Sequence, residues 1–466
     1  MRTTRLALFA VTAALALAQT EAFAGDVQVW LTTPDAIKRL SREPGIAFDG
    51  GLPAAIITID ADTRYQEIVG FGAALTDASA WLIQNKMSES QRAALLKELF
   101  GRDGGLGLSF TRLTIGASDF SLRDYSFDDQ PKGARDPDLR HFSIEPNRAD
   151  VLPLVKRALA INPQLKIMAS PWSAPGWMKS SDSLIQGSLL PEAFPAYAEY
   201  FRRYIDAYAA EGVAIYAITI QNEPHFEPAD YPGMRVTPPM RAAFIGSYLG
   251  PLLSRTHPEV RIWDWDHNWD EPQSPLTVLA DPNASRYVAG VAWHCYAGEP
   301  SAQGPVHDAH PDKETWLTEC SGGEWSQWKD ALPWMAGTLV RTTRQWSKGV
   351  LFWNLALDEN HGPHTGGCTD CRGVVTIDSR TGDVTRNLEY YILGHASRFV
   401  VPGAVRVDSG AEITGIDDVA FRNPDGSIVL IAVNRQSEPR AFGVRQKNQS
   451  FEYVLAPGSV ATFVWR

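Results

Sequence analysis

The chain has 466 residues and a formal net charge of −11 at pH 7. An acidic chain repels polyanions, so these values argue against nucleic acid as a partner, and none is expected. The length exceeds the roughly 250–300 residues at which single hydrophobic cores stop growing, which indicates one large domain and a smaller one.

The N-terminus has the pattern of an export signal. Two early arginines precede the apolar run Leu6–Ala18, and Ala22-Phe23-Ala24 supplies the small residues that a signal peptidase reads. We therefore predict a signal peptide over residues 1–24, cut before Gly25. The apolar run is shorter than the roughly 20 residues that span a bilayer, so no integral membrane segment is expected after cleavage. The predicted location is secreted or periplasmic.

The middle of the chain alternates short apolar runs with helical patterns. Short apolar runs of this kind are typical of parallel strands buried on both faces, and eight strand–helix repeats predict a (β/α)8 TIM barrel, an α/β fold, over residues 61–384. The eight runs are Ile68–Leu75, Ser109–Gly116, Leu165–Trp172, Ile215–Glu223, Val260–Asp266, Gly290–Ala297, Glu314–Cys320 and Gly349–Leu357. The helical patterns include Ser90–Phe100, Val151–Ile161, Ala193–Glu211 and Pro239–Thr256.

Both chain ends have β character. Residues 25–60 contain two strand-like runs, and residues 385–466 contain one helical piece followed by six runs at hairpin spacing. The segment Asn423-Pro424-Asp425-Gly426 is a turn between two of these runs. We predict an attached antiparallel β-sandwich formed from both chain ends. We expect this sandwich to support the barrel structurally. Binding of sugar is the alternative role.

Two glutamates interrupt the predicted barrel strands at their carboxyl ends. Glu223 ends the fourth run and Glu319 ends the seventh, and barrel enzymes carry their catalytic groups at this end of the strands. Glycoside hydrolysis needs two carboxyl groups that flank the scissile bond. A single glutamate here is typical of a salt-bridged rim residue, but two at facing strands favour catalysis.

The motifs around these glutamates resemble those of a known family. They are Gly70–Asp77, Ala169–Trp177, Thr219–Pro224, His294–Tyr296, Thr318–Cys320 and Trp353–Leu357. This ordered set resembles glycoside hydrolase family 30, and within it the glucosylceramidase (glucocerebrosidase)-like subfamily. The resemblance covers about residues 60–466. It implies a retaining mechanism in which Glu319 is the nucleophile and Glu223 the acid/base, with carboxyl groups about 5–5.5 Å apart.

The resemblance also implies roles for other residues. Arg112 and Tyr296 donate to the nucleophile and keep it ionised. The expected substrate-binding residues are Asp77, Trp172, Asn222, His294, Tyr296 and Trp353. Trp353 could line the bottom of the sugar-binding site, or it could be an ordinary residue of the hydrophobic core, and the sequence favours neither. Asp264, Asp266 and Asp270 are interpreted as hydrogen-bonding or substrate-contact residues rather than as catalytic acids.

No cofactor is expected, but the cysteines leave one metal alternative open. Cys295, Cys320, Cys368 and Cys371 allow three pairings, and the spacing favours a Cys368–Cys371 bridge. The same loop carries His361 and His364, so a zinc site is the alternative.

The expected function is hydrolysis of β-glucosidic bonds in β-glucosylceramide or a related β-glucoside. The substrate partner is a carbohydrate or glycolipid. One alternative within the family is an endo-β-1,6-glucanase, since the loop after the eighth run differs from that of the glucosylceramidases. The alternative from another class is a non-catalytic carbohydrate-binding protein.

Overall fold

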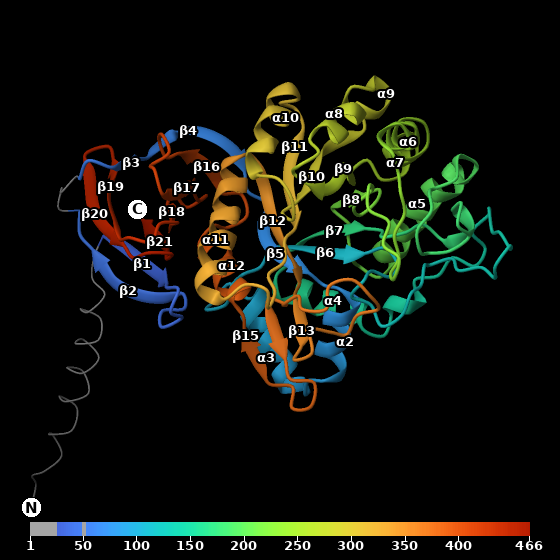
Figure 1. Ribbon diagram of the computed structural model, residues 1–466, viewed down its shortest axis with the longest axis horizontal. Coiled ribbons are helices and arrows are strands. Elements are labelled where there is room, and N and C mark those ends of the chain that lie inside the picture. The colour runs from blue at the N-terminus through green and yellow to red at the C-terminus, as the bar shows by residue number, and fades with distance from the viewer. Residues whose placement is uncertain (1–25, 49–52) are drawn as a thin grey trace, which may run out of the picture.

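The computed structural model describes residues 26–48 and 53–466, so the predicted signal peptide lies outside the described residues. Eight parallel strands close into a barrel in the order β10-β11-β12-β5-β6-β7-β8-β9 (Figure 1). They are β5 (Gly70–Ala74), β6 (Phe110–Thr114), β7 (Lys166–Ser170), β8 (Ala217–Thr219), β9 (Arg261–Asn268), β10 (Val288–His294), β11 (Glu314–Glu319) and β12 (Ser347–Asn354). All eight predicted strands are confirmed.

Helices follow the barrel strands and cover the outside of the barrel. They are α2 (Asp77–Asn85), α3 (Glu89–Phe100), α4 (Val151–Ile161), α5 (Phe194–Ala210), α6 (Pro238–Phe244), α7 (Gly250–Thr256), α8 (Gln273–Leu279), α9 (Pro282–Ser285), α10 (Gln303–Ala309), α11 (Trp328–Arg344) and α12 (Leu388–Ser397). A π-helical turn, η5 (Ile245–Leu249), joins α6 to α7, so the predicted helix Pro239–Thr256 is one nearly continuous element. Ser88 and Gln91 form a capping box that fixes the start of α3.

The interior of the barrel is filled by side chains. Trp263 from β9 stacks on Trp316 from β11 with ring centroids 4.2 Å apart, and Phe110 packs against both. Each of these rings is fully buried. This layer of rings fills the barrel interior, so any chemistry must take place at one end of the barrel.

A sandwich of two sheets lies beside the barrel, at the left of Figure 1. Its larger sheet has the order β2-β1-β21-β18-β17-β16-β4, and the smaller one β20-β19-β3. The strands are β1 (Val27–Thr32), β2 (Ser41–Ile46), β3 (Ile56–Thr58), β4 (Asp60–Glu67), β16 (Val405–Asp408), β17 (Ile416–Arg422), β18 (Ile428–Asn434), β19 (Arg440–Gln446), β20 (Gln449–Leu455) and β21 (Val460–Trp465). Since β1 pairs with β21, the prediction of a sandwich built from both chain ends is confirmed.

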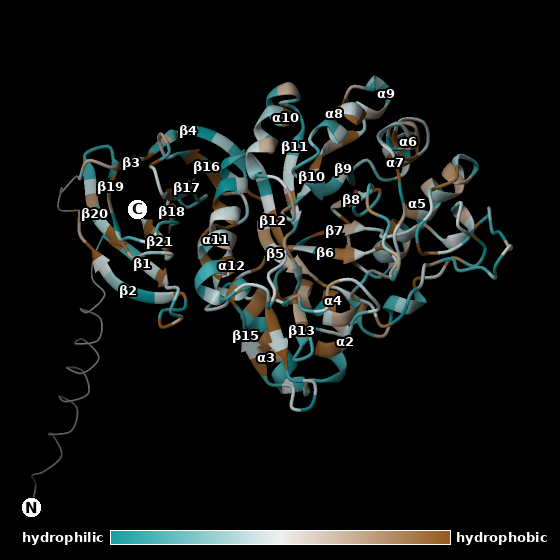
Figure 2. Cartoon of the chain, viewed as in Figure 1, coloured by the Kyte–Doolittle hydropathy of each residue, from teal (hydrophilic) through white to brown (hydrophobic). Residues whose placement is uncertain are grey.

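Two edge strands of the sandwich and one small sheet were not expected. Strands β2 and β4 are largely hydrophilic and partly exposed, as their teal colour in Figure 2 shows, and hydrophobic pattern alone does not reveal such strands. The small sheet joins β13 (Ala356–Asp358), β14 (Val375–Ile377) and β15 (Val384–Arg386) after the last barrel strand. It anchors the loop between β13 and β14, which reaches the barrel mouth.

Strand β4 pairs with β16 in the sandwich, and the first barrel strand begins at Gly70. The predicted division at residue 60 would separate β4 from the sheet it pairs with, so we propose that the barrel begins after Glu67. We keep the division near residue 384 as a proposal. Within the described residues, no helix is long and apolar enough to cross a membrane.

Candidate active site

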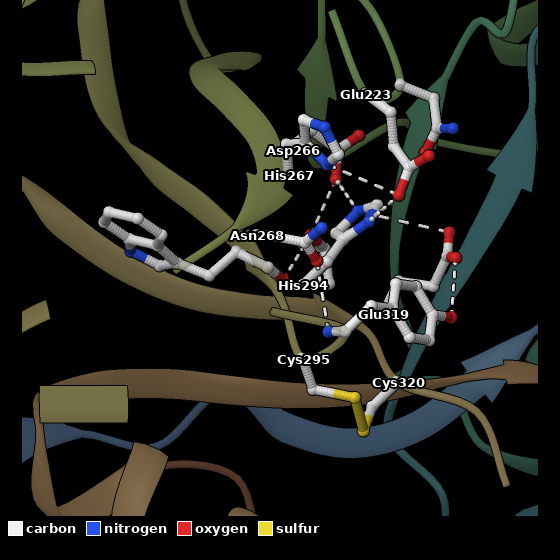
Figure 3. A network of polar contacts seen from close by, with 12 residues as sticks. Glu223, Asp266, His267, Asn268, His294, Cys295, Glu319 and Cys320 are labelled. Atoms are coloured by element: carbon white, nitrogen blue, oxygen red, sulfur yellow. Dashed lines mark hydrogen bonds and ion pairs between the residues drawn. A yellow bond between two sulfur atoms is a disulfide. The ribbon is translucent and has the colours of Figure 1, made fainter. Parts of the chain in front are cut away.

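The two predicted glutamates lie at the same end of the barrel (Figure 3). Glu319 is the last residue of β11, and Glu223 follows β8 by four residues. Glu223 has a φ of +48°, and its backbone N–H donates to the carbonyl of Asp266 at 3.0 Å. This bond ties the turn after β8 to the end of β9 and holds the Glu223 side chain over the barrel mouth.

Glu319 receives hydrogen bonds on both carboxylate oxygens. Arg112 Nη1 donates to Oε2 at 2.5 Å, and the Tyr296 hydroxyl donates to Oε1 at 2.8 Å. Arg112 is fully buried on β6, while the Tyr296 ring is 44% exposed. A cation and a hydroxyl on opposite oxygens fix the orientation of the carboxylate and stabilise its negative charge. Both expected donors to Glu319 are therefore in contact with it.

Glu223 lies against two imidazoles. His294 Nδ1 is 3.1 Å and His267 Nδ1 is 3.4 Å from Glu223 Oε1. Burial raises the pKa of Glu223, but the two imidazoles beside it outweigh this effect and lower the pKa to about 2. Burial lowers the pKa of His294, but the charge of Glu319 and the hydrogen bonds to Asp266 and Glu223 raise it to about 9. The pair therefore holds its proton on His294.

Asp266 is the central acceptor below the two glutamates. It is fully buried, and its pKa is held far below the usual value because Arg112 and His294 outweigh the effect of burial. Its five side-chain donors are Arg112 (2.8 Å), Ser170 (2.7 Å), Thr219 (2.6 Å), Thr318 (2.7 Å) and His294 (2.9 Å). These donors come from five different barrel strands, β6, β7, β8, β11 and β10. Asp266 therefore fits the expected hydrogen-bonding role, while Asp264 is buried in an ion pair with Arg241 at 2.8 Å.

His294 was expected to contact substrate, but its side chain is fully buried. It connects the two glutamates, since Nε2 lies 4.0 Å from Glu319 Oε2. The direction of a side chain at a strand end depends on the local register, and the pairing of β10 with β11 has a register irregularity between Trp293 and His294. The sequence pattern did not reveal it.

Three other expected residues surround Arg112. Asn222 accepts from Arg112 Nη2 at 2.8 Å. Trp172 and Trp353 stack on each other with centroids 5.0 Å apart, and the guanidinium carbon of Arg112 lies 4.8 Å and 5.5 Å from the two ring centroids. The structure therefore brings Asn222, Trp172 and Trp353 together beside Glu319.

Asp77 and Asp119 lie in different electrostatic surroundings. Asp77 begins α2 and hydrogen-bonds Ser121 and Tyr125, and burial raises its pKa to about 6. Burial and the charges of Glu319 and Glu223 raise the pKa of Asp119 well above its usual value. Within the described residues, Oδ1 of Asp119 has no hydrogen-bond partner. Asp119 was missed because it lies in an irregular loop after β6, five residues beyond the strand.

Two disulfides lie at the barrel mouth. Cys368–Cys371 forms as favoured from the spacing, so the loop has no thiolates and the zinc alternative there is wrong. The second bridge, Cys295–Cys320, was left open by the sequence. It joins the ends of β10 and β11 (Figure 3), and its cysteines are the sequence neighbours of Tyr296 and Glu319.

A TIM barrel with two carboxyl groups at the ends of its fourth and seventh strands is the arrangement of a glycoside hydrolase, and this chain is one. It belongs to glycosyl hydrolase family 30. The model of the family's TIM-barrel domain matches residues 68–400, and that of its β-sandwich domain matches residues 403–463.

Named relatives fall into two groups. The chain is 37% identical over 407 residues to endo-1,6-beta-D-glucanase neg1 of Aspergillus fumigatus, covering 81% of each chain. It is 30% identical over 439 residues to lysosomal acid glucosylceramidase of Mus musculus, covering 88% of this chain and 83% of the relative. Among solved structures, the endo-beta1,6-glucanase BT3312 has a TM-score of 0.86 at 33% identity and covers 95% of this chain and 99% of that one.

Proposed function

We propose that this chain is an exported, retaining endo-β-1,6-glucanase, with Glu319 as nucleophile and Glu223 as acid/base. The observation that supports it most is the polar network that holds both glutamates at one barrel mouth in a chain more similar to glucanases than to glucosylceramidases. The expected preference for β-glucosylceramide therefore gives way to the alternative, β-1,6-glucan.

The first step forms a glycosyl-enzyme. Glu319 Oε attacks the anomeric carbon, the bond from that carbon to the glycosidic oxygen breaks, and the leaving oxygen takes a proton from Glu223. Arg112 and Tyr296 hold the attacking carboxylate in one orientation before the reaction, which reduces the entropy lost in the transition state.

The proton for this step comes from the pair formed by His294 and Glu223. Two interacting groups titrate together, and here the proton lies on His294 in the free enzyme. As the leaving oxygen gains negative charge, Glu223 transfers a proton to it and takes one from His294 Nδ1 across the 3.1 Å contact. His294 is left neutral and Glu223 remains a carboxylate.

The second step reverses these roles. Glu223 accepts a proton from water, the water oxygen attacks the anomeric carbon, and the bond to Glu319 breaks. The proton returns to His294, so the site ends in its starting state. Two inversions at one carbon leave the sugar in the β configuration.

Three residues beside Glu319 are proposed to hold the sugar. The unpartnered Oδ1 of Asp119 is a free acceptor for a sugar hydroxyl, and leaving such a buried atom without a partner costs free energy. Asn222 is held by Arg112 through its Oδ1, and its amide nitrogen is proposed to donate to the 2-hydroxyl. Trp172 offers an apolar ring beside them.

Exposed aromatic residues favour a polymeric substrate. Phe226, Tyr296 and Trp325 are 47%, 44% and 55% exposed, and they lie on the loops that follow β8, β10 and β11. These are the strands that position Glu223, His294 and Glu319. Exposed rings around the reacting groups are suited to stack on the further glucose units of a glucan chain.

A substrate panel tests this proposal. Purified protein is incubated with β-1,6-glucan, glucosylceramide, an aryl β-glucoside and xylan, and Glu319→Ala is the blank. We expect the highest kcat/KM on β-1,6-glucan, with oligosaccharides as early products. Faster hydrolysis of glucosylceramide, or glucose as the sole early product, would reject the endo-glucanase assignment.

A further inference from the structure

Three side chains at the barrel mouth offer the ligand atoms of a transition-metal site. One carboxylate oxygen of Glu223 and one ring nitrogen each of His267 and His294 lie within 4.8 Å of one another. We infer that these residues bind one divalent ion of the zinc class, and that the bound ion inhibits the enzyme by blocking Glu223. The effect on activity rests on the proposed function, but the binding does not.

The spacing of the ligand atoms suits a tetrahedral ion. Glu223 Oε1 is 3.1 Å from His294 Nδ1 and 3.4 Å from His267 Nδ1. Zinc binds such atoms at about 2.0–2.2 Å, so two ligand atoms around a tetrahedral ion are about 3.4 Å apart. Two edges of the tetrahedron are therefore already close to the required length, and only small side-chain movements are needed.

His294 is oriented as a metal ligand. Its Nε2 lies 2.9 Å from Asp266 Oδ1, a geometry in which Nε2 carries the hydrogen and donates it to the carboxylate. Nδ1 is then the nitrogen that faces Glu223. Histidine ligands of metals commonly donate their other ring N–H to a carboxylate, which fixes the ring and strengthens it as a ligand.

His267 supplies the second, independent observation. Its Nδ1 is shielded from solvent, and its 3.4 Å contact with Glu223 Oε1 does not have the geometry of a hydrogen bond. A buried ring nitrogen with so weak a contact is costly, and a metal ion would satisfy it. The side chains of His267 and Glu223 are 13% and 15% exposed, so an ion can enter and keep water as its fourth ligand.

The donor set determines which ions bind. Two imidazole nitrogens and one carboxylate oxygen suit Zn²⁺ or Cu²⁺, whereas Mg²⁺ and Ca²⁺ prefer oxygen ligands alone. Glu223 bound to such an ion can neither donate nor accept a proton, so both steps of hydrolysis stop.

Calorimetry tests the binding directly. ZnCl2 is titrated into chelator-treated, dialysed full-length protein, and the wild type is compared with His267→Gln, His267→Asn and His141→Gln. His141 is the matched control because it belongs to the other such cluster among the described residues, with Asp128 and Asp136. We expect one Zn²⁺ per wild-type chain, affinity at least about tenfold weaker in both His267 variants and unchanged affinity in His141→Gln. Equal affinity in wild type and His267 variants of unchanged melting temperature would overturn the inference.

Activity and spectroscopy separate this inference from the proposed function. Zn²⁺ should inhibit the wild type reversibly, with recovery on EDTA and no effect of Mg²⁺, and Co²⁺ should give the strong visible absorption of a tetrahedral site. Binding that depends on His267 in a protein inactive on every β-glucoside refutes only the proposed function. An active enzyme without such binding refutes only the metal site.

Discussion

Arg112 donates a hydrogen bond to Glu319 while its guanidinium is fully shielded from solvent. The same guanidinium forms a buried ion pair with Asp266 at 2.8 Å. One cation therefore serves the proposed nucleophile and the central acceptor of the site, so its removal affects chemistry and folding together.

Arg112→Met should lose both activity and stability. Breaking a buried pair by removing one partner leaves an uncompensated charge and costs about 3–5 kcal/mol. Urea unfolding and kcat/KM measure the two effects. Arg241→Met is the control, since it breaks the buried pair with Asp264 away from the glutamates. A similar loss of stability with kcat retained is expected there; an equal fall in kcat in both variants would show that Arg112 acts only through folding.

The pH–rate profile should reflect the His294–Glu223 pair. The pKa of His294 is raised to about 9, so kcat/KM should fall as the pH rises through about 9 and the pair loses its proton. The same raised pKa adds stability that is fully present below the ordinary value of 6.5 and is lost as the pH rises through about 9. Asp266→Asn removes a group that raises the pKa of His294, so the alkaline limb should move to lower pH. An alkaline limb that stays in place or moves to higher pH would contradict proton transfer from His294 to Glu223.

The Cys295–Cys320 bridge should matter more than Cys368–Cys371. The two bridges join cysteines 25 and 3 positions apart in the sequence, and the longer loop restricts the unfolded chain more, by about 3.5 kcal/mol against about 1.6. The longer bridge also lies next to Tyr296 and Glu319. The double serine variant at Cys295 and Cys320 should therefore lose more melting temperature and more kcat than the one at Cys368 and Cys371. Larger losses in the variant at Cys368 and Cys371 would rule out the greater importance of the Cys295–Cys320 bridge.

Trp325 should contribute to polymer hydrolysis. Trp325→Ala is expected to raise KM for β-1,6-glucan severalfold and to leave kcat/KM for an aryl glucoside nearly unchanged, because stacking on a sugar beyond the cleaved bond is lost. Trp334→Ala is the control, since Trp334 is 41% exposed on α11, which packs against sandwich strands β17 and β18. Equal effects of Trp325→Ala on both substrates would contradict a polymer-binding role.

The barrel was predictable because its strands are short apolar runs that the fold buries on both sides. The sandwich strands rich in valine, isoleucine and phenylalanine were found for the same reason. Strands β2 and β4 were not, since Ser41–Ile46 and Asp60–Glu67 lie at sheet edges and are held by backbone pairing rather than by apolar burial.

The site was predictable where a motif fixes a residue to a strand end. Glu223, Glu319, Arg112 and Asn222 come together for this reason. Asp119 and the Cys295–Cys320 bridge depend on loop paths and neighbouring strands in three dimensions, which no local pattern encodes. His267 lies in β9 directly after Trp265 and Asp266, which have positive φ, and this irregularity decides which side chains reach Glu223.

Trapping of the glycosyl-enzyme tests the assignment of Glu319 most directly. The protein is incubated with an activated 2-deoxy-2-fluoro-β-glucoside, which slows the second step more than the first, and the labelled peptide is identified by mass spectrometry. The account predicts one fluoroglucosyl group per chain on the peptide that contains Glu319. A label on any other residue, or an active enzyme that accumulates no label, would contradict it.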